Sequence, residues 1–291
     1  MNPNLTSLPT LPPRKADSEN DPLEYLSASR LKCFQTCRLQ FYFRYIERIP
    51  TPTSPALVVG QVVHRVLQAW NMARWRGGDA SVEAMQPFFE AHWFEGCDKE
   101  DMIWESPDQE AREKSRAWSI LEHYLRHTPV PLDERPEAVE VVVERDLDAH
   151  GLPPLKGVID LVREGGRIVD FKTTARTPDP DQARHQNEVQ LGCYALLYRE
   201  ATGQMESGFE LHHLVKTKTP KLVVTPLELL DRDRVTRLRR LRRRVPLRHE
   251  RRKLLLADLL ERGPPDMIIG EVLQITKRGA DLLEGKPLGG G

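Results

Sequence analysis

The sequence predicts a mixed α/β fold in which helices flank a central sheet. Three observations predict it. Apolar residues recur at helical spacings through most of the first 127 residues. Between residues 138 and 173 the chain changes to short β-branched runs separated by glycine and proline. A helical pattern and two further strand-like runs then follow. The 291 residues are enough to bury a core without a disulfide or a structural metal.

The first half of the chain is predicted to be helical. A helix over residues 29–46 is expected to bury a stripe formed by Leu31, Phe34, Cys37, Phe41 and Tyr45. Prolines end it, and a second helix over about 60–75 is expected to bury Val63, Leu67 and Trp70. Residues 81–127 are predicted to be helical with interruptions. Residues 1–24 contain five prolines and are expected to form a disordered tail.

Five strands are predicted after residue 137. The first three are residues 138–147, 155–163 and 167–173, and a tight turn at Gly165–Gly166 joins the last two into a hairpin. A polar loop leads to a helix over about 186–201. A second hairpin follows, made of residues 208–216 and 221–226.

Composition excludes some classes of protein. Lys plus Arg and Asp plus Glu both number 43, so the chain is not a global polycation. Its longest apolar runs are far shorter than the roughly 20 residues of a membrane span. The N-terminus lacks the apolar core of a signal peptide, so a cytoplasmic protein is expected, with no membrane partner. Its four cysteines are then expected to be reduced.

The segment around the first hairpin carries the candidate chemistry. Asp170 and Lys172 point to the same face of their strand, while Phe171 points to the other. The turn places residue 160 opposite about residue 171, which brings Asp160 close to Asp170. Two adjacent carboxylates repel unless a cation neutralises them, and Mg²⁺ prefers such oxygen ligands. The alternative is an ordinary hairpin whose polar residues face solvent, but the flanking apolar strands argue for a covered sheet.

Three further residues are candidates by position. Gln190 and Tyr194 lie four residues apart on one helical face, and His64 lies in the first turn of the second predicted helix. Taken alone, each is compatible with an ordinary surface residue. Glu144 lies in the strand before Asp160 and is a weaker candidate for contact with the site.

Taken together, these elements resemble a known family. The order SASRLKCFQTCRLQFYFRYI, GQVVH, GVIDLV with GGRIVDFKTT, and QLGCYALLY is similar to the RecB-like branch of the PD-(D/E)XK nuclease superfamily. That branch includes the nuclease modules of RecB and AddB helicase-nucleases and the nucleases of CRISPR spacer acquisition. The resemblance covers about residues 26–216 and implies a restriction-endonuclease-like core, with helical additions at both ends.

The resemblance also implies roles for individual residues. His64, Asp160, Asp170 and the backbone carbonyl of Phe171 would bind Mg²⁺ or Mn²⁺. Lys172 would be the catalytic lysine, which positions the attacking water. Gln190 and Tyr194 would lie near that water and the DNA backbone.

One departure from the family concerns cysteines. Many relatives hold an iron–sulfur cluster through one cysteine after the N-terminal helix motif and three near the C-terminus. Cys37 stands at the first of these positions, but no cysteine follows Cys193. An iron–sulfur cluster of that pattern is therefore not expected, and Cys33 and Cys37 are expected to be buried thiols.

The expected domains are a tail over residues 1–24, a nuclease domain over 25–228 and an arginine-rich helical extension over 229–291. Eleven arginines and one lysine lie between Arg232 and Lys253. They could track a DNA backbone, or face solvent around an apolar stripe of Val235, Leu238 and Leu241.

The expected function is that of a metal-dependent deoxyribonuclease, of exonuclease type, in DNA repair, recombination or end processing. The chain has no G-x-x-x-x-G-K-[ST] phosphate loop, so any helicase would be a separate partner. Two alternatives stay open: a catalytically weak nuclease-fold scaffold or DNA-binding subunit of a helicase-nuclease complex, and a metal-dependent hydrolase of another substrate.

Overall fold

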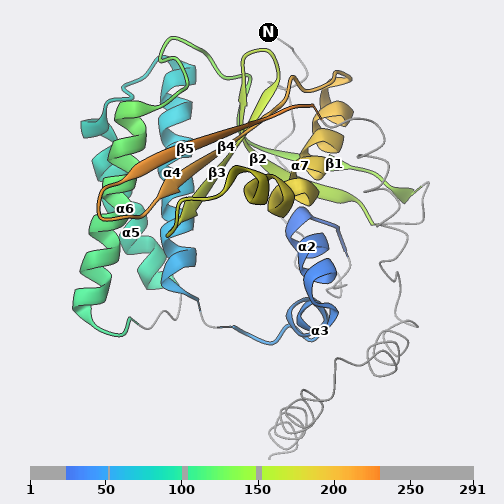
Figure 1. The fold of residues 1–291 in the computed structure, drawn as a ribbon, viewed down its shortest axis with the longest axis horizontal. Helices are drawn as coiled ribbons and strands as arrows, with labels where there is room; N and C mark the ends of the chain where they lie inside the picture. The colour runs from blue at the N-terminus through green and yellow to red at the C-terminus, as the bar shows by residue number, and fades with distance from the viewer. Residues whose placement is uncertain (1–23, 52, 100–103, 149–152, 230–291) are drawn as a thin grey trace, which may run out of the picture. The chain divides into compact units, whose positions relative to one another are not determined.

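A five-stranded mixed sheet forms the centre of the fold, as the sequence predicts (Figure 1). The computed structural model describes residues 24–51, 53–99, 104–148 and 153–229, and every structural statement below concerns these residues. The strand order is β1-β2-β3-β4-β5, and only β3 and β4 run parallel. The strands are β1 (Ala138–Arg145), β2 (Leu155–Arg163), β3 (Arg167–Thr174), β4 (Phe209–Val215) and β5 (Lys221–Leu227).

Helices cover both faces of the sheet (Figure 1). One layer consists of α4 (Pro55–Arg76), α5 (Val82–Lys99) and α6 (Pro107–His127). On the other face lies α7 (Pro180–Thr202), the crossover between the parallel strands β3 and β4, and the N-terminal α2 (Ala28–Thr36) packs against it. A short α3 (Arg38–Phe41) and a π-helical turn η1 (Tyr42–Ile46) follow α2. No described helix is both long and apolar enough to cross a bilayer.

The main hydrophobic core lies between the sheet and the α4–α6 layer. It joins Val63, Leu67 and Trp70 of α4, as predicted, to Tyr124 of α6 and Phe171 of β3, and all five are at most 2% exposed. Burying a large apolar side chain contributes about 1.5–3 kcal/mol. This packing fixes α4 and β3 relative to each other, and those two elements carry several candidate site residues.

The predicted helix over residues 29–46 is broken at Cys37. The backbone of Cys37 is extended, and its Sγ accepts a hydrogen bond from the Gln40 N–H, so this residue ends α2 and begins α3. Leu31, Phe34 and Phe41 are buried as expected. Cys37 is exposed and Cys33 only half-buried, so the prediction of two buried thiols is wrong here, because a capping residue faces outward.

Two helices begin earlier than the sequence analysis placed them. In α4 the Ser54 side chain caps the helix and Pro55 follows at its first position, and in α7 Asp179 and Pro180 play the same roles. Proline fits the first turn because the N–H groups there have no backbone acceptor within the helix, so the N–H that proline lacks is not missed. The sequence pattern instead predicts a helix break at Pro55 and a polar loop at Pro180. One consequence is that His64 lies well inside α4 rather than in its first turn.

At one point along β1 and β2, the regular alternation of side chains between the two faces of the sheet is interrupted. Leu161 packs in the α4–α6 core, whereas a Cβ on Gly157 would lie 2.6 Å from Leu197 of α7. Regular alternation would put positions 157 and 161 on the same face, so β2 must change faces between them. Across from this part of β2, between the pairs Val139–Leu161 and Val141–Ile159, the β1 residue is Glu140. Its φ of 47° is in the left-handed region. Such a conformation costs about 1–3 kcal/mol and is concentrated at functional sites.

A buried ion network supports the sheet on its α4–α6 face. Arg163 donates to both carboxylate oxygens of Glu134 and to both of Glu210, at 2.7–3.0 Å. Glu210 also pairs with His212, whose other ring nitrogen is 2.9 Å from the Tyr124 hydroxyl. Burial lowers the pKa of His212, so the neutral ring donates to Glu210 and accepts from Tyr124.

Replacing Arg163 with Met is expected to cost about 3–5 kcal/mol in the free energy of unfolding, because the buried Glu210 and the half-buried Glu134 lose the cation that they share. Urea unfolding of the variant measures this loss. Arg116→Met is the control: Arg116 is 57% exposed and pairs with Glu113, so its loss should cost less than about 1 kcal/mol. Equal losses in the two variants would contradict a structural role for this network.

Candidate metal and catalytic site

The candidate site lies where β2 and β3 separate. The two strands pair only over Leu161–Arg163 and Arg167–Val169, and the same register sets Asp160 opposite Asp170 rather than opposite Phe171. The Phe171 N–H donates to Asp160 Oδ2 at 2.8 Å. A side-chain carboxylate thus replaces the backbone acceptor at this point of the ladder. Asp160 is 7% exposed and Asp170 is 1% exposed, so the covered hairpin that the sequence predicted is confirmed.

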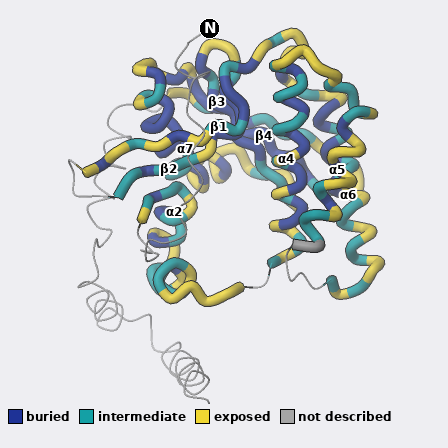
Figure 2. Tube along the Cα trace, turned by 180° about the vertical axis from the view of Figure 1, so that it is seen from behind, coloured by how far each residue is buried: buried dark blue, intermediate teal, exposed yellow. Residues whose placement is uncertain are grey.

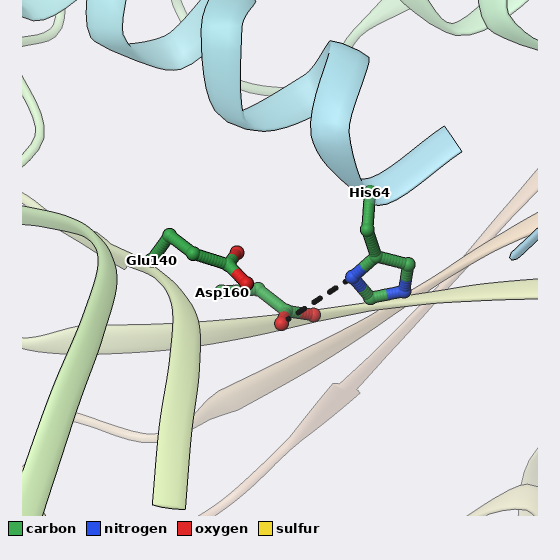
Figure 3. A group of neighbouring side chains, drawn as sticks. All are labelled: His64, Glu140 and Asp160. Atoms are coloured by element: carbon green, nitrogen blue, oxygen red, sulfur yellow. Dashed lines mark ion pairs between the residues drawn. The ribbon is translucent and has the colours of Figure 1, made fainter. Parts of the chain in front are cut away.

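His64 reaches this point from α4. Its Nδ1 lies 3.5 Å from Asp160 Oδ1, in the ion pair drawn in Figure 3. Burial alone would lower the pKa of His64, but the hydrogen bond and charge of Asp160 outweigh it and raise that pKa. The His64 ring also packs edge to face on Phe171, with centroids 6.3 Å apart.

Glu140 is a site residue that the sequence analysis missed. Ligand atoms of His64, Glu140 and Asp160 lie within 4.8 Å of one another, and Figure 3 shows the two carboxylates side by side below α4. The weaker candidate, Glu144, lies four residues further along β1 and pairs instead with Lys156 at 3.1 Å. No sequence signal separates the two glutamates, because the left-handed backbone that directs Glu140 into the site is not visible in the sequence.

The remaining predicted residues form one hydrogen-bonded chain with Asp170. Lys172 Nζ is 2.7 Å from Asp170 Oδ2 and donates to Gln190 Oε1 at 2.8 Å. Gln190 Nε2 in turn lies 2.7 Å from Asp170 Oδ1 and 2.8 Å from the Tyr194 hydroxyl. Gln190 and Tyr194 share one face of α7, as their spacing predicts. The carboxylate, lysine and glutamine are therefore held rigidly together.

The site therefore has two connected parts. His64, Glu140 and Asp160 form the first, below α4. The second part lies beside α7 and consists of Asp170, Lys172, Gln190 and Tyr194. Phe171 connects the two parts, because its N–H binds Asp160 and it stands between Asp170 and Lys172 in β3, while its ring packs in the core. A role of the Phe171 carbonyl as a metal ligand stays a prediction.

The positive charge near the carboxylates is too small to offset the effect of their burial and mutual repulsion on their pKa values. Burial and, second to it, the nearby charge of Asp160 raise the pKa of Glu140 to about 7, although His64 opposes the shift. Burial also raises the pKa of Asp170 despite the opposing charge of Lys172. Asp170 Oδ2 is fully buried, and apart from the ion pair with Lys172 it has no hydrogen-bond partner among the described residues. Buried carboxylate and imidazole donors whose negative charge is only partly compensated fit a divalent cation.

The chain belongs to the PD-(D/E)XK nuclease superfamily, whose family model matches residues 25–263. This match includes every candidate residue of the site. The family uses divalent metals, in agreement with the donor set described above.

Comparison with one solved structure supports the same fold. A crystal structure from Eubacterium rectale, described as a "putative exonuclease", is 16% identical, with a TM-score of 0.51. The alignment covers 88% of this chain and 91% of that one. A second crystal structure, of the protein SSO0001, is 14% identical with a TM-score of 0.34 over 78% and 76% of the two chains. No curated protein matches this chain.

Replacing Glu140 with Gln is expected to stabilise the metal-free protein at pH 8. An acid whose pKa rises from 4.5 to about 7 on folding holds its proton longer in the folded state, so stability falls as the pH rises through that window. Allowing for the partial exposure of Glu140, the variant should gain about 1–2 kcal/mol at pH 8 and little below pH 4.5. Urea unfolding in EDTA at both pH values measures the difference, and an equal stability of both proteins at pH 8 would count against the charge cluster.

Proposed function

We propose that this protein is a divalent-metal-dependent DNA nuclease of the RecB-like type that hydrolyses phosphodiester bonds. One observation carries the proposal: three carboxylates and a histidine converge where two strands separate, and a lysine is fixed at their edge. A protein that only binds or scaffolds DNA would gain nothing from gathering these repelling charges. Membership of a nuclease superfamily supports the same conclusion.

The proposed ligands are His64, Glu140, Asp160 and Asp170, with the Phe171 carbonyl as a further oxygen donor. When bound there, Mg²⁺ or Mn²⁺ would neutralise these carboxylates, polarise a phosphate oxygen and make a coordinated water more acidic. The Phe171 N–H keeps Asp160 in place, and burial keeps competing solvent away from Asp170. The donor set is rich in hard oxygen ligands, which favours these two cations.

Lys172 is the proposed catalytic group. Its ammonium lies beside Asp170, so it can orient the attacking water and stabilise the charge that develops on the phosphate. Gln190 fixes both the lysine and the carboxylate, while the Tyr194 hydroxyl fixes Gln190. In-line attack needs this rigidity, because an error of about 1 Å in position can cost about a hundredfold in rate.

The biological role follows as a proposal from the family and its exonuclease-like neighbour. We assign an exonuclease type of activity on DNA in repair, recombination or end processing, in the cytoplasm. A helicase or recombination subunit would be a separate chain. The arginine-rich segment after residue 229 lies outside the described residues, so its contact with DNA stays a prediction.

Lys172→Ala is expected to lower DNA cleavage at least a hundredfold while folding and DNA binding persist, because the lysine acts on the transition state. Cleavage of end-labelled single- and double-stranded DNA with Mg²⁺, Mn²⁺ or EDTA measures this. Lys114→Ala is the matched control, since Lys114 is also half-exposed and paired with a glutamate. Full activity of Lys172→Ala would refute its catalytic role. Absence of metal-dependent cutting by the wild type, with DNA binding intact, would favour a scaffold subunit instead.

Glu140→Gln is expected to raise the Mn²⁺ concentration for half-maximal cleavage about tenfold or more, because a ligand loses its charge. Glu144→Gln on the same strand is the control, since Glu144 faces Lys156 rather than the site. Activity measured over a Mn²⁺ series separates the two. The same metal requirement in both variants would remove Glu140 from the ligand set.

A further inference from the structure

Two histidines at the end of α6 form a cluster that the candidate nuclease site does not use. His123 and His127 are four residues apart, so both project from one face of the helix. Their rings stack, with centroids 4.5 Å apart and an angle of 30° between the ring planes. His123 is half-buried and His127 is exposed, and Figure 2 shows exposed and intermediate residues along α6. The pair is therefore open to a ligand from solvent.

The ring of His127 is held in one tautomer. Its Nδ1 lies 2.9 Å from the backbone carbonyl oxygen of His123. Because a carbonyl oxygen only accepts, Nδ1 carries the hydrogen, and Nε2 of the neutral ring keeps a free lone pair. Histidines that bind metals commonly donate their other ring N–H to a carbonyl or a carboxylate, which fixes the ring and makes the ligating nitrogen more basic. This hydrogen bond therefore prepares His127 as a metal ligand.

The ring of His123 is prepared in a different way. Burial, and second to it the charge of His127, lower the pKa of His123, so its ring is neutral at pH 7. Neither ring pairs with a carboxylate among the described residues. Four other histidines do so, namely His64, His92, His185 and His212. Within the described part of the chain, no acid, thiol or further imidazole joins the pair as a third ligand.

The surroundings of the pair favour a cation. Helix α6 ends at His127, and the last carbonyl groups of a helix have no partner within it and carry partial negative charge. The neighbouring cation, Arg126, lies 2.9 Å from Glu122 and 3.7 Å from Glu83, so its charge is compensated. A positive ion beside the two rings is therefore stabilised by the helix end and is not strongly repelled.

We propose that His123 and His127 bind one divalent ion of the borderline class, Zn²⁺, Ni²⁺ or Cu²⁺, through one nitrogen of each ring, with water completing the coordination. Two histidines at this spacing bind one zinc ion in the H-E-x-x-H helix, so the spacing suits a shared ion. Imidazole donors without a carboxylate select these ions over Mg²⁺ and Mn²⁺, which prefer oxygen ligands. The site does not depend on the proposed nuclease function, none of whose residues lies on α6.

A bound ion would join the last two turns of α6. Those turns carry Tyr124, whose hydroxyl is 2.9 Å from His212 in the buried network. Because the helix holds the two rings together only in the folded protein, binding stabilises the fold by mass action. The site thus couples the stability of this helix end to the supply of a transition metal.

Calorimetric titration of Ni²⁺ into the untagged full-length protein tests the site, and Zn²⁺ is the second probe. His127→Ala is expected to weaken binding at this site about tenfold or more, because loss of a ligand costs at least as much as loss of a group that only orients one. His127 is exposed, so this variant keeps the core intact. His123→Ala should weaken binding in the same way, and an excess of Mg²⁺ should not displace the Ni²⁺.

Two further variants serve as controls. His92→Ala removes another half-buried imidazole on a helix, one whose neighbouring carboxylate, Glu95, is already paired with Arg65. Its Ni²⁺ affinity should equal that of the wild type. His64→Ala removes the imidazole of the candidate nuclease site and identifies ions bound there, and it should keep the Ni²⁺ site on α6.

Three results would overturn the proposal. They are unchanged Ni²⁺ binding in His127→Ala, equal weakening in His92→Ala, and loss of all Ni²⁺ binding in His64→Ala. Thermal unfolding gives a second readout. Ni²⁺ should raise the midpoint of unfolding of the wild type and of His92→Ala more than that of His127→Ala, and an equal rise in all three proteins would contradict a site at the end of α6.

Discussion

Mutual repulsion among Asp160, Asp170 and Glu140 is the constraint around which this site is built. Burial raises the pKa of Glu140 and of Asp170, so the fold holds these acids at a cost in the absence of a cation. The Phe171 N–H, His64 and Lys172 offset only part of that cost. The core between α4 and the sheet supplies the rest of the stabilisation. A divalent cation would turn this unfavourable arrangement into a favourable one.

The position of the site follows from the sheet topology. Because β2 and β3 separate after three residue pairs, the Asp160 side chain can take the hydrogen bond that a backbone carbonyl would otherwise accept. Helix α4 then reaches the gap from one face and α7 from the other. The first brings the histidine, and the second brings the glutamine and tyrosine that fix the lysine. Neither layer alone would complete the site.

Much of this arrangement can be predicted from the sequence. The strand over residues 155–163 is confirmed to the residue, and Asp170, Lys172, Gln190 and Tyr194 meet as strand and helix periodicity require. Periodicity could not reveal Glu140, because a left-handed φ in mid-strand interrupts the alternation on which such predictions depend. It also missed the first turns of α4 and α7, where proline begins a helix instead of ending one.

Calorimetric titration of Mn²⁺ into the purified protein tests the central claim most directly, when repeated at pH 7 in two buffers of different ionisation enthalpy. The account predicts saturable binding at one site, with release of protons to the buffer, because carboxyl groups with raised pKa values must ionise to bind a cation. The dependence of the measured heat on the buffer reports that release. No binding at millimolar Mn²⁺, or binding without any proton release, would contradict the account.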